Sequence, residues 1–174
     1  VSPKAVIEID IIQDPIYFIP FLYWPLSKDL VEIDIKTETK IKNYLANGGM
    51  ILFDVIGFSR ENFSLENSKF KNIKDFLSSI EANNLTPITK DHTLTKSFYL
   101  LKKFPGRWDN KNLLIESSSL GLNDGVSSVI LGFNDWASAW ALDNNNNPIF
   151  PVVPGGERQR EISYRFGINI TMYA

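Results

Sequence analysis

The segment Asn47-Gly48-Gly49-Met50-Ile51-Leu52-Phe53-Asp54 decides the fold, because it joins the end of a helix to a buried strand. The preceding residues, Thr37 to Asn47, predict a helix, since Ile41, Tyr44 and Leu45 fall on one face. Glycine commonly ends a helix because it adopts left-handed backbone at little cost. The apolar run that follows is typical of a strand buried on both faces. Together these features make half of a βαβ unit, which predicts a parallel sheet.

Segments on either side of this unit predict further strands and one more helix. Val6 to Ile12 alternates apolar and acidic residues, which favours a half-buried strand. Ile16 to Trp24 is rich in aromatic residues and predicts a short buried strand. Phe70 to Ile80 carries apolar residues at helical spacing. Two more strands are expected at Leu113–Glu116 and Ser128–Leu131, so the chain reads as mixed α and β.

The second half of the chain also contains a segment of undetermined type, a polar turn and a segment with two possible readings. Leu94 to Leu101 is an apolar segment of undetermined type, and Asp143 to Asn147 predicts a polar turn. From Ile162 to Met172, apolar residues alternate as in a strand, yet a helical stripe also runs through the segment. Glu157 directly after Gly156 suits the positive end of a helix dipole, so we predict a helix here.

Length, composition and charge exclude several classes of protein. A chain of 174 residues that is 44% hydrophobic can bury one core, so a single domain over residues 1–174 is expected. A net charge of −2 argues against binding to nucleic acid. The absence of cysteine excludes disulfides, zinc–thiolate sites and a thiol nucleophile. No dinucleotide or Walker motif and no membrane-spanning run is present, and we expect neither a cofactor nor a resident metal.

Six blocks of sequence carry a family resemblance, in the same order as in that family. They are Phe21–Leu26, Asn47–Asp54, Asp91–Tyr99, Phe104–Trp108, Asn134–Ala137 and Pro154–Glu161. Through them the chain resembles an uncharacterised bacterial family, domain of unknown function 4159. The resemblance covers the chain from near residue 15 to its end and implies no known activity.

The resemblance also implies a fold and a cellular setting. The family is similar to class I glutamine amidotransferase-like folds, which are three-layer, flavodoxin-like α/β sandwiches with a mostly parallel sheet. Its members usually begin with a strand and a helix that this chain lacks. They often form the C-terminal part of membrane-anchored proteins similar to the aerotolerance Bat proteins. We therefore expect a piece of a longer protein of the bacterial inner membrane, with the periplasmic side favoured over the cytoplasmic.

Asp54 stands where amidotransferase-like enzymes carry their cysteine nucleophile, on the turn after a central strand. Cysteine-dependent glutamine hydrolysis is therefore excluded. An aspartate at this turn can act as a nucleophile, a metal ligand or a hydrogen-bonding anchor. The structural alternative is a carboxylate that caps nearby backbone amides at the end of a strand, and this is the commoner role.

Asp135 and Trp136 follow the strand predicted at Ser128–Leu131. Ligands of open parallel sheets collect at the carboxyl ends of the strands, where Asp54 and Asp135 are both expected. Trp136 then serves either as a platform for a ligand or as part of a packed loop, and the sequence leaves both open. A cleft lined by these three residues is the predicted binding site.

The remaining candidates are one histidine, one glutamate and three arginines. His92 is the only histidine and is either a general base or a turn residue beside Asp91. Arg158 and Arg160 follow a Gly-Gly turn that suits an anion, or they pair with neighbouring acids such as Glu157. Arg107 is expected either to contribute to the ligand site or to stack on its neighbour Trp108.

Two functions follow from these candidates. The preferred one is a non-catalytic domain that binds a small ligand or a partner protein. The alternative is a hydrolase-like enzyme that uses Asp54, His92 and Glu157, with or without a hard cation. The alternative requires the three side chains to lie within about 10 Å of one another, close enough for hydrogen bonds or a bridging water.

Overall fold

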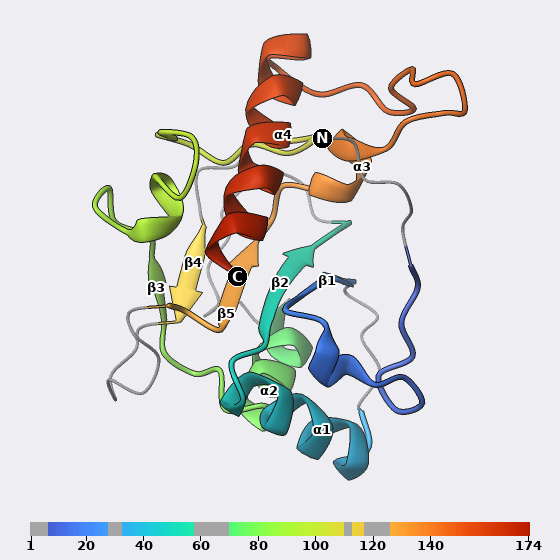
Figure 1. Cartoon of the computed structure of the whole chain (residues 1–174), viewed down its shortest axis with the longest axis vertical. Helices are drawn as coiled ribbons and strands as arrows, with labels where there is room; N and C mark the ends of the chain where they lie inside the picture. Colours follow the sequence, from blue (N-terminus) through green and yellow to red (C-terminus); the bar gives the residue numbers. More distant parts are fainter. Residues whose placement is uncertain (1–6, 28–32, 58–69, 110–112, 117–125) are drawn as a thin grey trace.

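A computed structural model describes residues 7–27, 33–57, 70–109, 113–116 and 126–174, and within them a five-stranded sheet has helices on both faces (Figure 1). The strands are β1 (Phe21–Leu26), β2 (Met50–Val55), β3 (Leu85–Pro87), β4 (Leu114–Glu116) and β5 (Val129–Gly132). Their order is β1-β2-β5-β4-β3, with β1, β2 and β5 parallel. Because β4 runs antiparallel to both its neighbours, four strands share one direction. The predicted mixed α/β fold with a mostly parallel sheet is confirmed.

The unit predicted around the two glycines forms as expected. Helix α1 (Ile35–Ala46) begins at Asp34, whose side chain accepts a hydrogen bond from the Thr37 amide at 2.9 Å. It ends before Gly48, whose φ of +89° lies in the left-handed region. Strand β2 follows and is buried along its whole length between β1 and β5.

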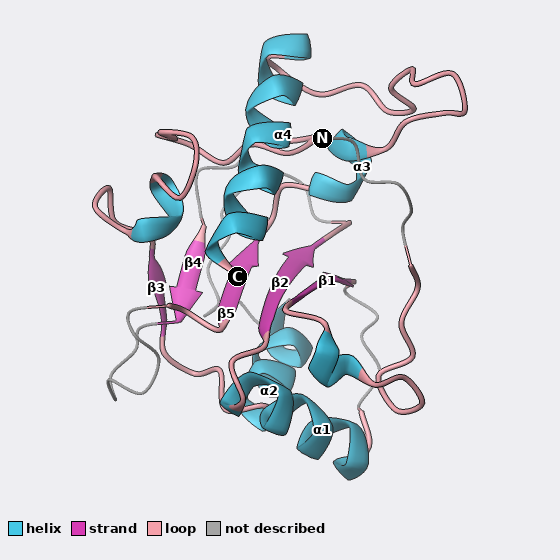
Figure 2. Cartoon of the chain, viewed as in Figure 1, coloured by secondary structure: helices cyan, strands magenta, loops and turns pink. Residues whose placement is uncertain are grey.

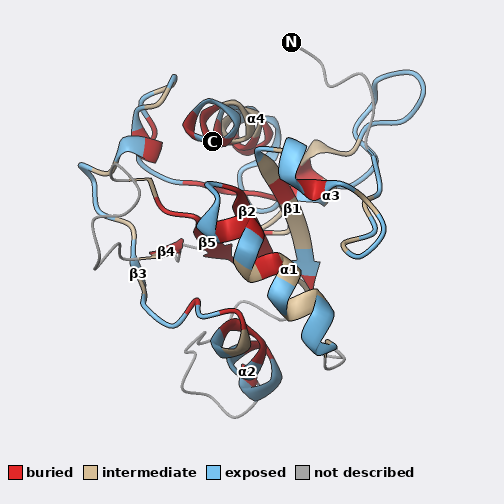
Figure 3. Ribbon diagram, turned by 60° about the horizontal axis from the view of Figure 1, so that its bottom comes forward, coloured by how far each residue is buried: buried red, intermediate tan, exposed pale blue. Residues whose placement is uncertain are grey.

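Two apolar cores lie on opposite faces of the sheet because residues alternate along β2 (Figures 2 and 3). Ile51 and Phe53 face the core covered by α1 and α2 (Lys71–Ser79). Met50 and Leu52 face the core covered by α4 (Gly156–Tyr173). The short helix α3 (Trp136–Trp140) and the 3-10 turn η3 (Thr93–Thr95) lie on this second face.

Of the two strands predicted at the start of the chain, the first is absent and the second forms only in part. Val6 lies outside the described residues, and residues 7–12 form no strand. The side chain of Asp10 explains this, since its carboxylate accepts hydrogen bonds from the Ile12 and Gln13 amides at 2.7 and 3.0 Å and closes a turn. The segment from Ile16 to Trp24 is not one strand either, because a 3-10 turn, η1 (Ile16–Phe18), precedes β1.

The other predicted elements are confirmed within one or two residues. Helices lie at α1, α2 and α4, strands at β4 and β5, and a turn at Asp143–Asn147. The segment of undetermined type becomes η3 followed by an irregular loop. Strand β3 and helix α3 were not predicted. Among the described residues, no helix has the length and hydropathy needed to span a bilayer.

Candidate functional site

The carboxylate of Asp54 lies at the carboxyl end of β2 and is fully occupied by hydrogen bonds. Oδ1 accepts from the backbone amides of Asn134 and Asp135, both at 3.1 Å. Oδ2 accepts from the Trp136 amide at 2.7 Å and from the Tyr23 hydroxyl at 2.8 Å. Three of the four donors are backbone amides at the start of α3, so Asp54 binds the turn between β5 and α3 to the centre of the sheet.

Burial has the largest effect on the pKa of the Asp54 carboxyl group. Asp54 is completely buried, and burial raises its pKa to about 6 although its hydrogen bonds act in the opposite direction. The pKa of Tyr23 is raised well above its usual range, first by burial and then by the charge of Asp54. The tyrosine hydroxyl therefore stays protonated and serves as a donor to the carboxylate.

Trp136 fills the space where a ligand was expected. The side chain is fully buried, its indole N–H donates to the Phe104 carbonyl at 3.0 Å, and its ring packs on Phe166 at 4.9 Å. It also lies against Gly132, where an added Cβ would come within 2.0 Å of the ring. Trp136 is thus the packed-loop alternative, and it occupies the carboxyl end of β5.

Asp135 and Arg107 lie together at the partly exposed rim of this site. Asp135 has a left-handed backbone (φ 52°), and its carboxylate lies 3.5 Å from Nη1 of Arg107. The guanidinium of Arg107 lies over the ring of Trp108 at 4.9 Å and over that of Phe150 at 5.2 Å. The expected stacking of Arg107 on Trp108 is present, and the same side chain holds Asp135.

Gln159 and Arg160 join the start of α4 to the surrounding loops, and both are buried. The amide nitrogen of Gln159 donates to the carbonyls of Gly106, Arg107 and Val153. Nη1 of Arg160 donates to the Ala139 carbonyl at the end of α3 at 2.7 Å. Arg160 therefore tethers the end of α3, whose first amides Asp54 holds.

A pocket of about 320 Å³ lies beside the start of α4 and is lined partly by Lys103, Arg158 and Ile162. Arg158 is exposed there, and Lys103 forms an ion pair with Asp109 at 2.9 Å. Only Arg158 of the two arginines after the glycine turn faces solvent, since Arg160 is buried. Of the two arginines predicted for an anion site at this turn, only Arg158 is accessible to a ligand.

The proposed hydrolase residues do not come together. Glu157 is in the first turn of α4, 80% exposed, with Nε of Arg160 3.4 Å away. Nε2 of His92 lies 3.5 Å from the hydroxyl of Tyr173, at the last turn of the same helix. Sixteen residues of helix rise about 24 Å, well beyond the roughly 10 Å that the hydrolase requires. His92 caps η3 through Nδ1, and burial lowers its pKa.

The described residues contain no group of three or more His, Cys, Asp or Glu side chains arranged to hold a metal ion. Sequence reasoning also missed two buried amides of α4. Asn169 accepts from the Tyr99 amide at 2.7 Å and donates to the carbonyls of Leu94 and Tyr99, in the same way that Gln159 holds its loops. The apolar stripe of Phe166 and Ile170, extended back by helical spacing, reaches Gln159 and would have signalled its burial.

Comparisons with known proteins identify a family for this chain. No curated protein matches the chain. A family model described as a domain of unknown function, DUF4159, matches residues 1–174, which is the whole chain. The chain therefore belongs to the family of domains of unknown function DUF4159.

Proposed function

We propose that this protein is a non-catalytic domain that binds a partner protein or a small ligand. One observation carries the proposal: the carboxylate of Asp54, at the position of a nucleophile, already accepts four hydrogen bonds from Tyr23 and the start of α3. A nucleophile or a metal ligand needs a lone pair directed at the substrate or the ion. The surroundings of Asp54 instead suit a structural anchor.

The carboxyl edge of the sheet is closed by a helix that is held at both ends. Asp54 meets the amino end of α3, which carries positive dipole charge, and Arg160 meets its carboxyl end, which carries negative charge. Between them the ring of Trp136 is buried against Gly132. This arrangement supports a surface function over chemistry inside a cleft at this edge.

The connection from α3 to α4 is a surface suited to a partner (Figure 1). It exposes apolar side chains that a soluble domain would otherwise bury: Leu142, Ile149, Phe150 and Val153. Its tip is closed by Asp143, which accepts from the Asn145 and Asn147 amides, both at 2.8 Å. Its base is held where Arg160 donates to the Phe150 carbonyl at 2.6 Å. Such preorganisation lowers the entropy cost of docking.

The finer fold and the cellular setting belong to the same proposal. We place the domain among the flavodoxin-like, class I glutamine amidotransferase-like sandwiches. The parallel strands β1, β2 and β5 with helices on both faces support that placement. The parent is proposed to be a membrane-anchored protein of the bacterial cell envelope, on the basis of the family resemblance.

Two measurements test this function. In the first, the purified domain is incubated with chromogenic esters, phosphate esters and glutamine, beside the variant Asp54→Asn. We expect no product above the buffer control from either protein. Turnover that the natural protein shows and Asp54→Asn lacks would establish an enzyme and overturn the proposal.

The second measurement addresses binding. A photo-crosslinking amino acid is placed at Ile149, which is 54% exposed, in cells that make the natural protein. The control position is Lys74, on the exposed face of α2. A discrete adduct from position 149 that position 74 does not give is the expected result. Equal labelling from both positions would contradict a specific partner at this surface.

A further inference from the structure

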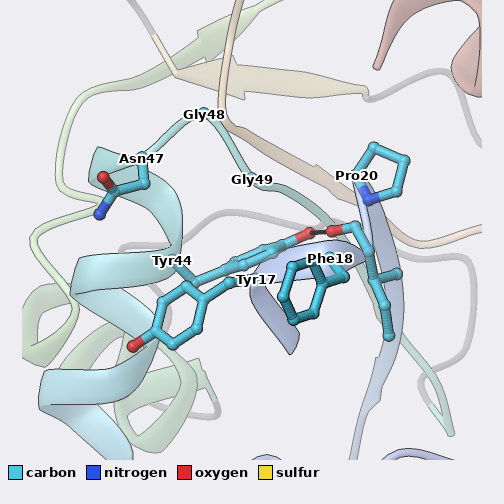
Figure 4. Close-up of a pocket in the computed structure, with 8 residues that line it drawn as sticks. Tyr17, Phe18, Pro20, Tyr44, Asn47, Gly48 and Gly49 are labelled. Atoms are coloured by element: carbon cyan, nitrogen blue, oxygen red, sulfur yellow. Dashed lines mark hydrogen bonds between the residues drawn. The ribbon is translucent and has the colours of Figure 1, made fainter. Parts of the chain in front are cut away.

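An open pocket of about 240 Å³ lies at the amino end of β2, at the other end of that strand from Asp54 (Figure 4). One wall is formed by η1 and the turn that leads into β1. The other is formed by the end of α1 with Gly48 and Gly49. Three aromatic residues line it, Tyr17, Phe18 and Tyr44.

Hydrogen bonds and packing fix both walls. The single proton of the Tyr44 hydroxyl is shared between two carbonyls, that of Ile19 at 2.8 Å and that of Met50 at 3.2 Å, and this links the two walls. Gly49 lies against the Tyr44 ring so closely that an added Cβ would come within 2.3 Å of it. The ammonium of Lys40 donates to the Asp14 carbonyl at 2.7 Å and joins the segment before η1 to α1. The pocket is therefore preformed.

The electrostatics of the pocket favour a positive charge. Phe18 is 87% exposed and Tyr17 is 52% exposed, so two aromatic rings are accessible at the rim. Aromatic faces attract cations. The carboxyl end of α1 adds negative dipole charge, and its last turn has no basic residue. Among the described residues, no lysine, arginine or histidine lines the pocket to compete with a cation.

We propose that this pocket binds an organic cation, the guanidinium of an arginine side chain on a partner protein. A planar guanidinium stacks on aromatic rings and donates hydrogen bonds to backbone carbonyls. The described part of the chain places no aspartate or glutamate on the pocket wall, which argues against a metal ion. The ring of Phe18 is almost wholly exposed, so it is free to contact a partner chain. This inference rests on the proposed function and names the chemistry of one contact.

The test is a titration of the isotope-labelled domain with N-acetyl-argininamide, followed by two-dimensional NMR. The amides of Gly48 and Gly49 report on the pocket because they line it. The matched control ligand is N-acetyl-citrullinamide, which has nearly the same shape without the charge. We expect saturable shifts with the arginine compound and at least about fivefold weaker binding of citrulline, since cation–π attraction needs the charge.

Protein variants separate stacking from simple apolar contact. Phe18→Leu keeps an apolar side chain but removes the ring, and should weaken arginine binding about two- to fivefold. The control variant is Phe98→Leu, at an aromatic residue that is 62% exposed in the loop after η3, and it should leave arginine binding unchanged. Equal binding of citrulline, or unchanged binding by Phe18→Leu, would overturn the proposal.

Tetramethylammonium distinguishes the source of the cation. Binding of arginine that exceeds that of tetramethylammonium supports a protein partner, and binding of tetramethylammonium alone would refute it in favour of a small ligand. A failed titration without enzymatic turnover would remove this inference and leave the proposed function standing. Turnover that depends on Asp54 would overturn the proposed function itself.

Discussion

Asp54 and Asp135 lie at the carboxyl ends of neighbouring strands of the sheet, yet their side chains have different surroundings. Asp54 is wholly buried among donors, whereas Asp135 stays partly exposed and pairs with Arg107. Their position at strand ends follows from the sequence, because Asp54 comes directly after one buried apolar run and Asp135 shortly after another. The burial of Trp136 and the capture of Asp54 depend on α3, whose five residues give no periodic signal.

The raised pKa of Asp54 predicts a specific pH dependence of stability. The native carboxyl has a pKa of about 6, whereas an unfolded aspartate has about 3.9. The native state thus binds more protons between these values. The contribution of Asp54 to the free energy of unfolding is therefore largest below about pH 4. It falls by about 3 kcal/mol as the pH rises through 6. In urea unfolding, the unfolding free energy of the natural protein relative to that of Asp54→Asn should fall by this amount as the pH rises, because the other titrating groups are common to both proteins.

The opposite slope would contradict that prediction. If the difference in unfolding free energy between the two proteins grew with pH, the four donors would outweigh burial and the native pKa would lie below 3.9. Asp54→Asn directs an amide group at some of those donors and so costs stability. That cost does not vary with pH in this range, because asparagine does not titrate.

We expect a side chain at Gly132 to clash with the ring of Trp136. In Gly132→Ala the added Cβ would meet the buried Trp136 ring at 2.0 Å, and a strained core of this kind costs about 1–3 kcal/mol. The matched control is Gly167→Ala within α4, where the Cβ meets Trp140 at an ordinary 3.4 Å. That variant should be neutral or more stable by up to about 1 kcal/mol. An equal change in melting temperature for the two variants would argue against tight packing at Gly132.

At the scale of the elements, predictions from sequence succeeded where periodicity is long. Helices α1, α2 and α4 run for 12, 9 and 18 residues. The first two carry a clear apolar face, whereas α4 was assigned with the help of Glu157 at its start. Strand β3 has only three residues and contains Pro87, which fits an edge position but gives no alternation to detect. The strand predicted from the alternation over residues 7–12 does not form. The side chain of Asp10 instead accepts hydrogen bonds from nearby backbone amides, which closes a turn.

The tether from α4 to the α3–α4 connection predicts a local change in dynamics. Arg160 binds the carbonyls of Ala139 and Phe150 with two separate nitrogens. Arg160→Lys has one ammonium and cannot reproduce the fork, so the connection should open more often. Hydrogen exchange at the Ile149 and Val153 amides should become at least about tenfold faster, because breaking a hydrogen bond to a charged group costs about 1.5–3 kcal/mol.

Arg158→Lys is the control for that measurement, since Arg158 is exposed and lies two residues earlier on the same helix. It should leave exchange at both amides unchanged. If both variants accelerated exchange alike, the effect would come from the overall charge at the start of α4. The tether would then have no special role in holding the connection.

At the scale of the whole molecule, the two cores share their central strand. Residues of β2 alternate between the core under α1 and α2 and the core under α4, so neither side can lose its packing without exposing β2. The two sides also share β5. The predicted single domain over residues 1–174 therefore implies one cooperative unfolding transition, in which both faces of the sheet are lost together.

The tryptophans allow this cooperativity to be measured on each face separately. Trp24 packs on Phe53 and Phe76, at 5.8 and 5.7 Å, in the core covered by α1 and α2. Trp136 packs on Phe166 in the other core. In two-dimensional NMR of the urea-unfolding series, the indole N–H signals of Trp24 and Trp136 should disappear with the same midpoint. A lower midpoint for Trp24 would show that α1 and α2 unfold before the core under α4, and the chain would then contain two units of unequal stability.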